Sequence, residues 1–213
     1  MNIGFEKLTD LALKYGLVPD KYFYHWDKFG IWQLNVLKEY GLKPNNKIID
    51  IGCGAMRFGV HAVKYLDDKN YSGVDGFKPY IPLSMDILEE LKIKKRFSIK
   101  FEKDFNFSIF NQTFDFAVAQ SVFTHLSKKQ IESCLKNLKP HMNKKAKFIF
   151  TYLNHNTPRG FYYYGDGNDP MISSQKINSN YLNLIAEKEN LKFYNLNKTN
   201  HPSFQEVGCF EFY

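Results

Sequence analysis

Residues 47–59 read Lys-Ile-Ile-Asp-Ile-Gly-Cys-Gly-Ala-Met-Arg-Phe-Gly. Segment 48–51 is apolar and rich in β-branched isoleucine, which is typical of a buried parallel strand. Gly52 and Gly54 follow it and allow a tight turn in which the backbone approaches a ligand closely. Apolar residues then recur at helical spacing over 58–66. Strand, glycine turn and helix form a unit whose free N–H groups and helix dipole suit a carboxylate or a phosphate.

Strands and helices alternate after this unit. Strands are predicted at 47–51, 71–75, 97–101, 114–120, 147–152, 191–197 and 206–213, and helices at 57–67, 80–92, 127–139 and 179–189. Ser127 and Gln130 have the spacing of a capping box at a helix start. This order predicts an α/β fold, namely a doubly wound, Rossmann-like sheet of seven strands with helices on both faces. The sheet is expected to be mostly parallel with an antiparallel last strand.

Two further helices are predicted before the first strand, at about 3–17 and 27–40. Gly41 is the expected cap of the second, and Pro44 stops it. We therefore expect residues 1–43 to form an N-terminal helical extension that covers the cleft, and residues 44–213 to form the α/β domain.

Composition and charge limit the class of protein. The formal net charge of +7 is spread over many lysines, which favours a solvated surface over a nucleic-acid footprint. Cys53, Cys134 and Cys209 lack paired or metal-like spacing, which indicates a reducing compartment. The N-terminus shows neither a signal pattern nor a long apolar stretch, so we expect a cytoplasmic protein without membrane insertion.

The glycine spacing departs from the dinucleotide pattern G-x-G-x-x-G. Four residues separate Gly54 from the next glycine, Gly59, where the pattern has two. Asp75 closes the second predicted strand, 21 residues beyond Gly54. A carboxylate there can accept hydrogen bonds from both hydroxyls of a ribose.

Three motifs in order resemble those of class I S-adenosylmethionine-dependent methyltransferases. Ile-Ile-Asp-Ile-Gly-Cys-Gly at 48–54 is similar to their first motif, Tyr-Ser-Gly-Val-Asp at 71–75 to their second-strand motif, and the run 114–126 to their fourth-strand motif. The resemblance spans about residues 44–153. It implies that residues 44–213 are a class I methyltransferase domain with S-adenosylmethionine as cofactor and S-adenosylhomocysteine as product.

The resemblance also implies roles for individual residues. Asp50 is expected to face the amino group of the cofactor, Asp75 the ribose, and Asp104 the adenine amino group, with Phe105 packed on the ring. The full set of expected cofactor-binding residues is Asp50, Gly52, Cys53, Gly54, Arg57, Asp75, Gly76, Asp104, Phe105, Gln120 and Ser121.

One departure from the family pattern lies inside the first motif. Met56 stands where the third glycine is usual, and Arg57 follows it. A bulky residue here bears on how the helix packs against the strand. Arg57 is interpreted either as a cofactor contact or as one half of a surface ion pair.

Three histidines are candidates for catalysis. Methyl transfer to a hydroxyl needs alignment of the acceptor and a group that takes its proton, and histidine suits this near neutral pH. His125 follows the fourth strand, His155 the fifth, and His201 lies between the last two strands. For His125, the alternative to a base or a substrate contact is a capping or packing role.

The segment 154–177 is rich in glycine and aromatic residues and is predicted to be a long loop that recognises the acceptor. The expected substrate-binding residues in it are Arg159, Tyr162, Tyr163 and Tyr164. A surface loop without a role in recognition is the alternative.

These features favour an O-methyltransferase that acts on a small polar acceptor, such as a nucleotide sugar or another precursor of a surface or capsule polysaccharide. The saccharide interpretation comes from a similarity of Gly-Cys-Gly-x-x-Arg, Asp169-Pro170 and His201-Pro202 to a bacterial subgroup of small-molecule and carbohydrate-modifying enzymes. An RNA methyltransferase and a non-catalytic cofactor-binding protein are the alternatives. No His or Cys pair has zinc-site spacing, so no metal ligands are predicted. Scattered carboxylates could hold a divalent ion, and the sequence leaves that requirement open. The sequence leaves the oligomeric state open, including a homodimer.

Overall fold

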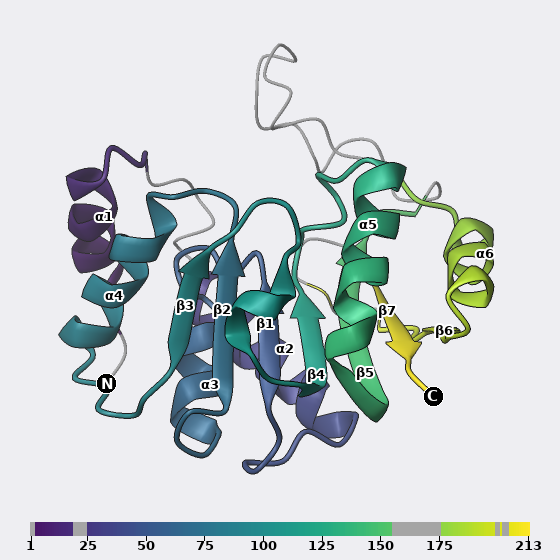
Figure 1. The fold of residues 1–213 in the computed structure, drawn as a ribbon. Coiled ribbons are helices and arrows are strands. Elements are labelled where there is room, and N and C mark those ends of the chain that lie inside the picture. The colour runs from purple at the N-terminus through teal and green to yellow at the C-terminus, as the bar shows by residue number, and fades with distance from the viewer. Residues whose placement is uncertain (1–2, 19–24, 155–175, 199–200, 202–204) are drawn as a thin grey trace. The chain divides into compact units, whose positions relative to one another are not determined.

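The computed structural model describes residues 3–18, 25–154, 176–198, 201 and 205–213. They group into two compact units, Met1–Asp104 and Phe105–Tyr213. The seven strands follow the order β3-β2-β1-β4-β5-β7-β6 (Figure 1). The predicted Rossmann-like α/β fold is thereby confirmed.

The first unit carries the parallel strands β1, β2 and β3. Ile48 of β1 pairs with Tyr71 of β2, and Ser72 of β2 pairs with Ser98 of β3. All residues of β1 and β2 are buried, including the polar Asp50, Ser72 and Asp75, as expected for strands inside a parallel sheet. The elements of this unit are α1 (Phe5–Lys14), α2 (Trp26–Glu39), β1 (Ile48–Ile51), α3 (Gly59–Tyr65), β2 (Tyr71–Asp75), α4 (Tyr80–Glu90) and β3 (Ser98–Phe101).

The second unit carries the remaining four strands. β4 and β5 are parallel, whereas β7 lies between β5 and β6 and is antiparallel to both. The elements of this unit are η2 (Phe107–Phe110), β4 (Phe114–Ala119), α5 (Lys128–Leu138), η3 (Lys139–His141), β5 (Met142–Tyr152), α6 (Ser179–Lys188), β6 (Lys192–Asn195) and β7 (Glu206–Glu211).

Most predicted boundaries agree with these elements, and the predicted capping box of Ser127 and Gln130 is present at the start of α5. The start of β5 is a clear exception, because the strand begins at Met142 and not at residue 147. Its first residues include exposed lysines, and Lys145 has a positive φ of 63°. A register shift between Phe114 and Phe116 of β4 accompanies this irregular start, so no alternating apolar pattern marks it in the sequence.

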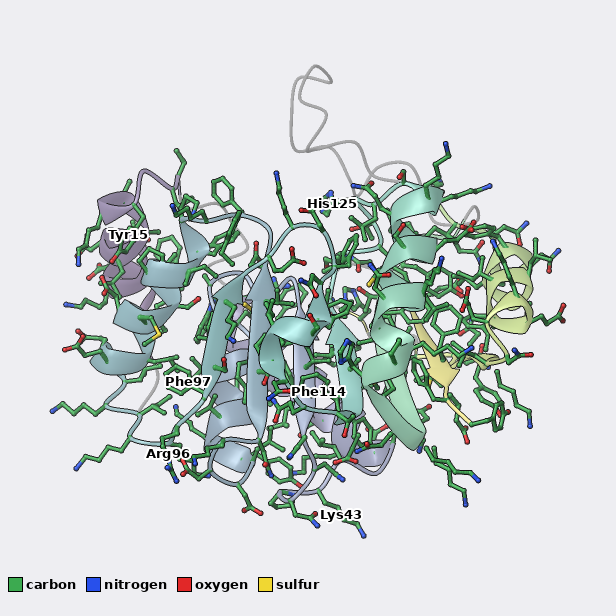
Figure 2. The ribbon with its side chains drawn as sticks, viewed as in Figure 1. Tyr15, Lys43, Arg96, Phe97, Phe114 and His125 are labelled. Carbon is green, nitrogen blue, oxygen red and sulfur yellow. The ribbon has the colours of Figure 1, made fainter. Side chains whose placement is uncertain are left out.

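Polar contacts join α1 to α4 in the first unit. Lys14 and Tyr15 both donate to one carboxylate oxygen of Asp86, each at 2.7 Å. Tyr15 is labelled in Figure 2. Lys7 pairs with Glu90 at 3.3 Å farther along the same two helices. The two helices lie side by side in Figure 1.

Helix α2 supports the turn that follows β1. The indole N–H of Trp26 donates to the carbonyl of Ala55 at 3.2 Å. One turn later, Gly30 lies so close to this segment that a Cβ there would be 2.0 Å from the carbonyl oxygen of Arg57 and 2.4 Å from the His61 ring. Asp27 pairs with His61 at 3.1 Å on the same face. Helix α2 thus packs against the glycine turn and holds it in place.

The core of the second unit is aromatic. Phe150 stacks on Phe210 with ring centroids 4.8 Å apart and lies 4.6 Å from the ring of Phe123. Gly208 leaves room for this cluster, because a Cβ there would be 2.7 Å from the Phe150 ring and 2.9 Å from that of Phe193. Burial of these large rings is a main source of stabilisation for the unit.

The contact of α2 with the turn is testable with Gly30→Ala. The added methyl group would meet backbone, which cannot move aside as a flexible side chain can. We expect the free energy of unfolding to fall by about 1–3 kcal/mol in chemical denaturation. Gly4→Ala is the matched control, because a Cβ there meets nothing within 4 Å. Equal stability of the two variants would contradict the close approach of α2.

Candidate active site

The turn after β1 has an unusual backbone. Gly52, Gly54 and Met56 all have positive φ, at 71°, 51° and 60°. The N–H groups of Gly52 and Cys53 both donate to the carbonyl of Val74, at 2.8 and 3.1 Å, which ties the turn to the end of β2. A Cβ at Gly54 would meet nothing within 4 Å. The backbone at Gly54 therefore faces open space that a ligand could enter.

Met56 keeps the backbone conformation that glycine usually supplies. Its φ of 60° lies in the left-handed region, which is strained for most side chains. The side chain is fully buried and packs over Gly59, where a Cβ would be 2.3 Å from the methionine Cε. The turn also delays the helix, which begins at Gly59 and not at the predicted residue 57. The methionine side chain that stands in place of the usual glycine thus fits because Gly59, three residues later, leaves room for it.

Asp75 links the segments that follow β1 and β2. One of its carboxylate oxygens accepts the N–H of Gly54 and the other accepts the N–H of Phe77, each at 2.8 Å. Burial raises the pKa of this carboxyl, and the two N–H donors oppose the shift. Each oxygen retains lone-pair capacity, so the carboxylate can still accept hydrogen bonds from a ligand.

Asp50 is buried on β1 and accepts a hydrogen bond of 2.7 Å from the hydroxyl of Tyr71. Burial raises its pKa to about 7, the Tyr71 hydroxyl and Arg57 lower it, and Asp75 adds to the increase. A carboxyl with such a pKa changes its charge readily near neutral pH.

The other expected residues of the first unit differ in their surroundings. Cys53 is buried, and desolvation raises the pKa of its thiol well above the usual range, which opposes a nucleophilic role. The Arg57 guanidinium lies over the Phe29 ring at 4.8 Å, a cation–π contact with α2. Gly76 and Asp104 are exposed beyond β2 and β3.

In the second unit, Ser121 follows β4 with a positive φ of 58°. Its N–H donates to the Thr151 hydroxyl at 2.8 Å, and its carbonyl accepts from the Thr124 hydroxyl at 2.7 Å. The Thr151 hydroxyl donates in turn to Gln205 at 2.5 Å, and the Gln205 amide donates to the Ser121 hydroxyl at 2.9 Å. This closed network holds the strained backbone of Ser121. Phe105, at the start of the unit, also has a positive φ, of 59°.

His201 is buried and contacts Gln120. Its Nδ1 accepts the N–H of Gln205 at 3.3 Å. Nε2 of the ring lies 2.6 Å from the terminal amide of Gln120. The facing atom of the amide is its own Nε2, so which of the two groups donates depends on the tautomer of the ring and the orientation of the amide. The structure thus brings Gln120, Ser121 and His201 together.

His125 lies beyond the carboxyl end of β4 (Figure 2). Its backbone N–H donates to the carbonyl of Val122 at 2.9 Å. The residue is exposed by its accessible surface, but neighbouring protein atoms still desolvate the imidazole in part and lower its pKa below the usual value. The neutral form of the ring is therefore favoured near pH 7. The remaining candidates, His155, Arg159, Tyr162, Tyr163 and Tyr164, lie outside the described residues.

Sequence reasoning missed four side chains of these networks, namely those of Tyr71, Thr124, Thr151 and Gln205. Thr151 comes at the carboxyl end of a buried strand, where polar residues face ligands in α/β folds, so its position was a usable signal. Tyr71 begins a strand and Gln205 precedes one. The neighbouring sequence of neither residue indicates that its side chain forms a polar contact in the site.

The family model described as tellurite resistance protein TehB matches residues 19–153, more than half of the chain. The chain belongs to the TehB family. This is a family of class I S-adenosylmethionine-dependent methyltransferases, so the predicted resemblance and cofactor are confirmed. A search of curated proteins found no match to the sequence.

Solved methyltransferase structures share the fold. The chain is similar to magnesium protoporphyrin IX methyltransferase from Synechocystis PCC 6803 with bound S-adenosylhomocysteine (TM-score 0.68, 11% identity, 96% of this chain and 94% of that chain). It is also similar to a methyltransferase from Aquifex aeolicus (TM-score 0.64, 16% identity, 99% of this chain and 98% of that chain). A third similar structure is the methyltransferase domain of bacterial CtHen1-CN (TM-score 0.62, 20% identity, 85% of this chain and 96% of that chain). At these identities the likeness shows the fold alone.

The described residues of this TehB-family chain lack two further features. No helix among them has both the length and the apolar character needed to span a membrane. No cluster of three or more His, Cys, Asp or Glu side chains with metal-site geometry occurs among them.

Proposed function

We propose that the chain transfers the methyl group of S-adenosylmethionine to a hydroxyl of a small polar acceptor. The observation that most directly supports the cofactor part of this proposal is the position of the Asp75 carboxylate. The N–H groups of Gly54 and Phe77 hold it beside a turn that has open space at Gly54. A fixed carboxylate beside a glycine turn suits a ribose next to an amino-acid moiety.

The residues of the first unit fit this cofactor. Asp75 would hold the ribose hydroxyls, Asp50 would receive the ammonium group, and Gly54 leaves space for close backbone approach. Arg57 is already stacked on Phe29, so its part in cofactor binding is proposed as electrostatic, through its effect on Asp50. The bound cofactor supplies an electrophilic methyl group on a sulfonium. The further contacts proposed for it are Gly52, Cys53, Gly76, Asp104, Phe105, Gln120 and Ser121.

We propose that His125 is the general base that removes the proton of the acceptor hydroxyl. A neutral imidazole is required for this, and the lowered pKa of His125 supplies it near pH 7. His201 is less suited, because the N–H of Gln205 occupies its Nδ1 lone pair and its Nε2 is in contact with the Gln120 amide at 2.6 Å. We propose instead that His201 orients the Gln120 amide. His155 remains a candidate on its sequence position alone.

The acceptor class is proposed from the sequence. A nucleotide sugar or other saccharide precursor fits the tyrosine-rich segment 154–177, in which Arg159, Tyr162, Tyr163 and Tyr164 are the proposed contacts. We also propose a cytoplasmic location, the division into an extension of residues 1–43 and a domain of residues 44–213, and a homodimer as an assembly to test.

A methyl-transfer screen read by mass spectrometry tests the acceptor. The panel contains nucleotide sugars, RNA oligonucleotides and tellurite, the last because of the description of the family model. We expect a mass increase of one methyl group on a sugar hydroxyl. Methylation of RNA in place of the sugars would overturn the small-acceptor proposal.

Asp75→Ala tests the cofactor site. Saturating S-adenosylhomocysteine at 100 times its Kd should stabilise the native protein by about 2.7 kcal/mol, which is on the order of 5–10 °C in Tm. The variant should lose most of this shift, measured against its own ligand-free Tm, whereas Asp10→Ala, an exposed change on α1, should retain it. A full shift in Asp75→Ala would remove the ribose assignment.

His125→Ala tests the general base. With the acceptor from the screen, we expect kcat to fall about 10²–10⁴-fold while the affinity for S-adenosylhomocysteine stays the same. In the parent protein, kcat should decrease at acidic pH as the imidazole takes up a proton, and this limb of the pH profile should vanish in the variant. The control is His141→Ala in η3. Turnover close to that of the parent protein would exclude His125 as base.

A further inference from the structure

Tyr71 places a hydroxyl group in the buried interior of the first unit. The whole residue is 1% exposed, and its hydroxyl donates to Asp50 at 2.7 Å and lies 3.4 Å from the sulfur of Met56. The Tyr71 and Phe58 rings lie 6.4 Å apart, so the ring itself is part of the apolar packing. A phenylalanine would pack there equally well, and the hydroxyl must therefore be explained by its polar partner.

Two glycines leave room for this hydroxyl. A Cβ at Gly59 of α3 would be 2.5 Å from the Tyr71 oxygen, and a Cβ at Gly73 of β2 would be 3.2 Å from it. The hydroxyl thus reaches Asp50 through a space that any larger residue at Gly59 would close. The backbone of a helix and of a strand both accommodate the contact between Tyr71 and Asp50.

The carboxyl of Asp50 needs such a donor. It is buried, and desolvation favours its neutral form, as does the nearby charge of Asp75. The Tyr71 hydroxyl and the Arg57 guanidinium favour its ionised form. Cys53 is the other titratable group of the turn that interacts with it, and burial keeps that thiol neutral. Tyr71 from β2 and Arg57 from the turn therefore act together against desolvation.

We propose that Tyr71 is a positioning residue of the cofactor site, whose hydroxyl orients the Asp50 carboxylate to receive the α-ammonium group of S-adenosylmethionine. The proposal rests on the proposed function. Tyr71 occupies one carboxylate oxygen, Oδ2, and directs the other, Oδ1, toward the ligand. A neutral Asp50 attracts a cation poorly, so ligand affinity should rise with pH up to the point at which Asp50 is fully ionised.

Two ligands separate this role from a merely structural one. S-adenosylhomocysteine carries the α-ammonium group, whereas 5′-methylthioadenosine has the same adenosine part without it. Titration calorimetry of the full chain gives the Kd of each ligand from about pH 5.5 to about pH 8, a range centred near the pKa of Asp50. For the parent protein we expect S-adenosylhomocysteine to bind more tightly as pH rises through about 7, and 5′-methylthioadenosine to show no such change.

Tyr71→Phe should weaken S-adenosylhomocysteine about tenfold at pH 7, the usual effect of losing a hydrogen bond to a charged group. The loss should shrink at higher pH, because Asp50 then ionises without help. Affinity for 5′-methylthioadenosine should be unchanged. Tyr65→Phe is the matched control, since its hydroxyl donates to the carbonyl of Leu42 at 3.1 Å, and it should affect neither ligand.

Equal effects of Tyr71→Phe on the two ligands, or no effect on either, would overturn the positioning role. The pH profile of the parent protein tests the same point without any variant, since equal pH dependence for both ligands also contradicts it. Failure of the parent protein to bind S-adenosylhomocysteine at any pH would instead overturn the proposed function, and the inference with it.

Discussion

The carboxylate of Asp75 links the two segments on which the cofactor site depends. It accepts one N–H from the turn after β1 and one from the segment after β2, so a single side chain fixes both strand ends. The same turn donates two N–H groups to the carbonyl of Val74. Three successive hydrogen bonds from Gly52, Cys53 and Gly54 therefore hold the turn against β2. A site that must bind a ligand through its backbone needs this rigidity, because a mobile turn would lose conformational entropy on binding.

The space behind the turn is equally constrained. Gly30 lets α2 approach the carbonyl of Arg57, and Gly59 lets the side chain of Met56 fold back into the core. Each glycine serves a close approach from another element and not a special backbone angle of its own. Helix α2 is thus part of the support of the site, although it precedes the first strand in the chain.

Much of the fold follows from the sequence, because alternating apolar strands and amphipathic helices leave few arrangements. The positions of Asp50, Gly54 and Asp75 also follow, since each lies at a strand end in a recognisable motif. What the sequence conceals is side-chain contact between segments. Thr151 meets Ser121 because β4 and β5 pair, and Gln205 joins them because β5 and β7 pair. Tyr71 meets Asp50 because β1 and β2 run in parallel register. The left-handed backbone of Met56 was similarly hidden, because a methionine gives no sign of a positive φ.

Both tryptophans of the chain, Trp26 and Trp32, lie on α2. Trp26 is 5% exposed and donates its indole N–H to the carbonyl of Ala55 in the glycine turn. Intrinsic tryptophan fluorescence of this chain therefore originates from a single helix that touches the turn. The emission is a natural optical reporter of the turn, which makes ligand-induced changes there observable in the unlabelled protein.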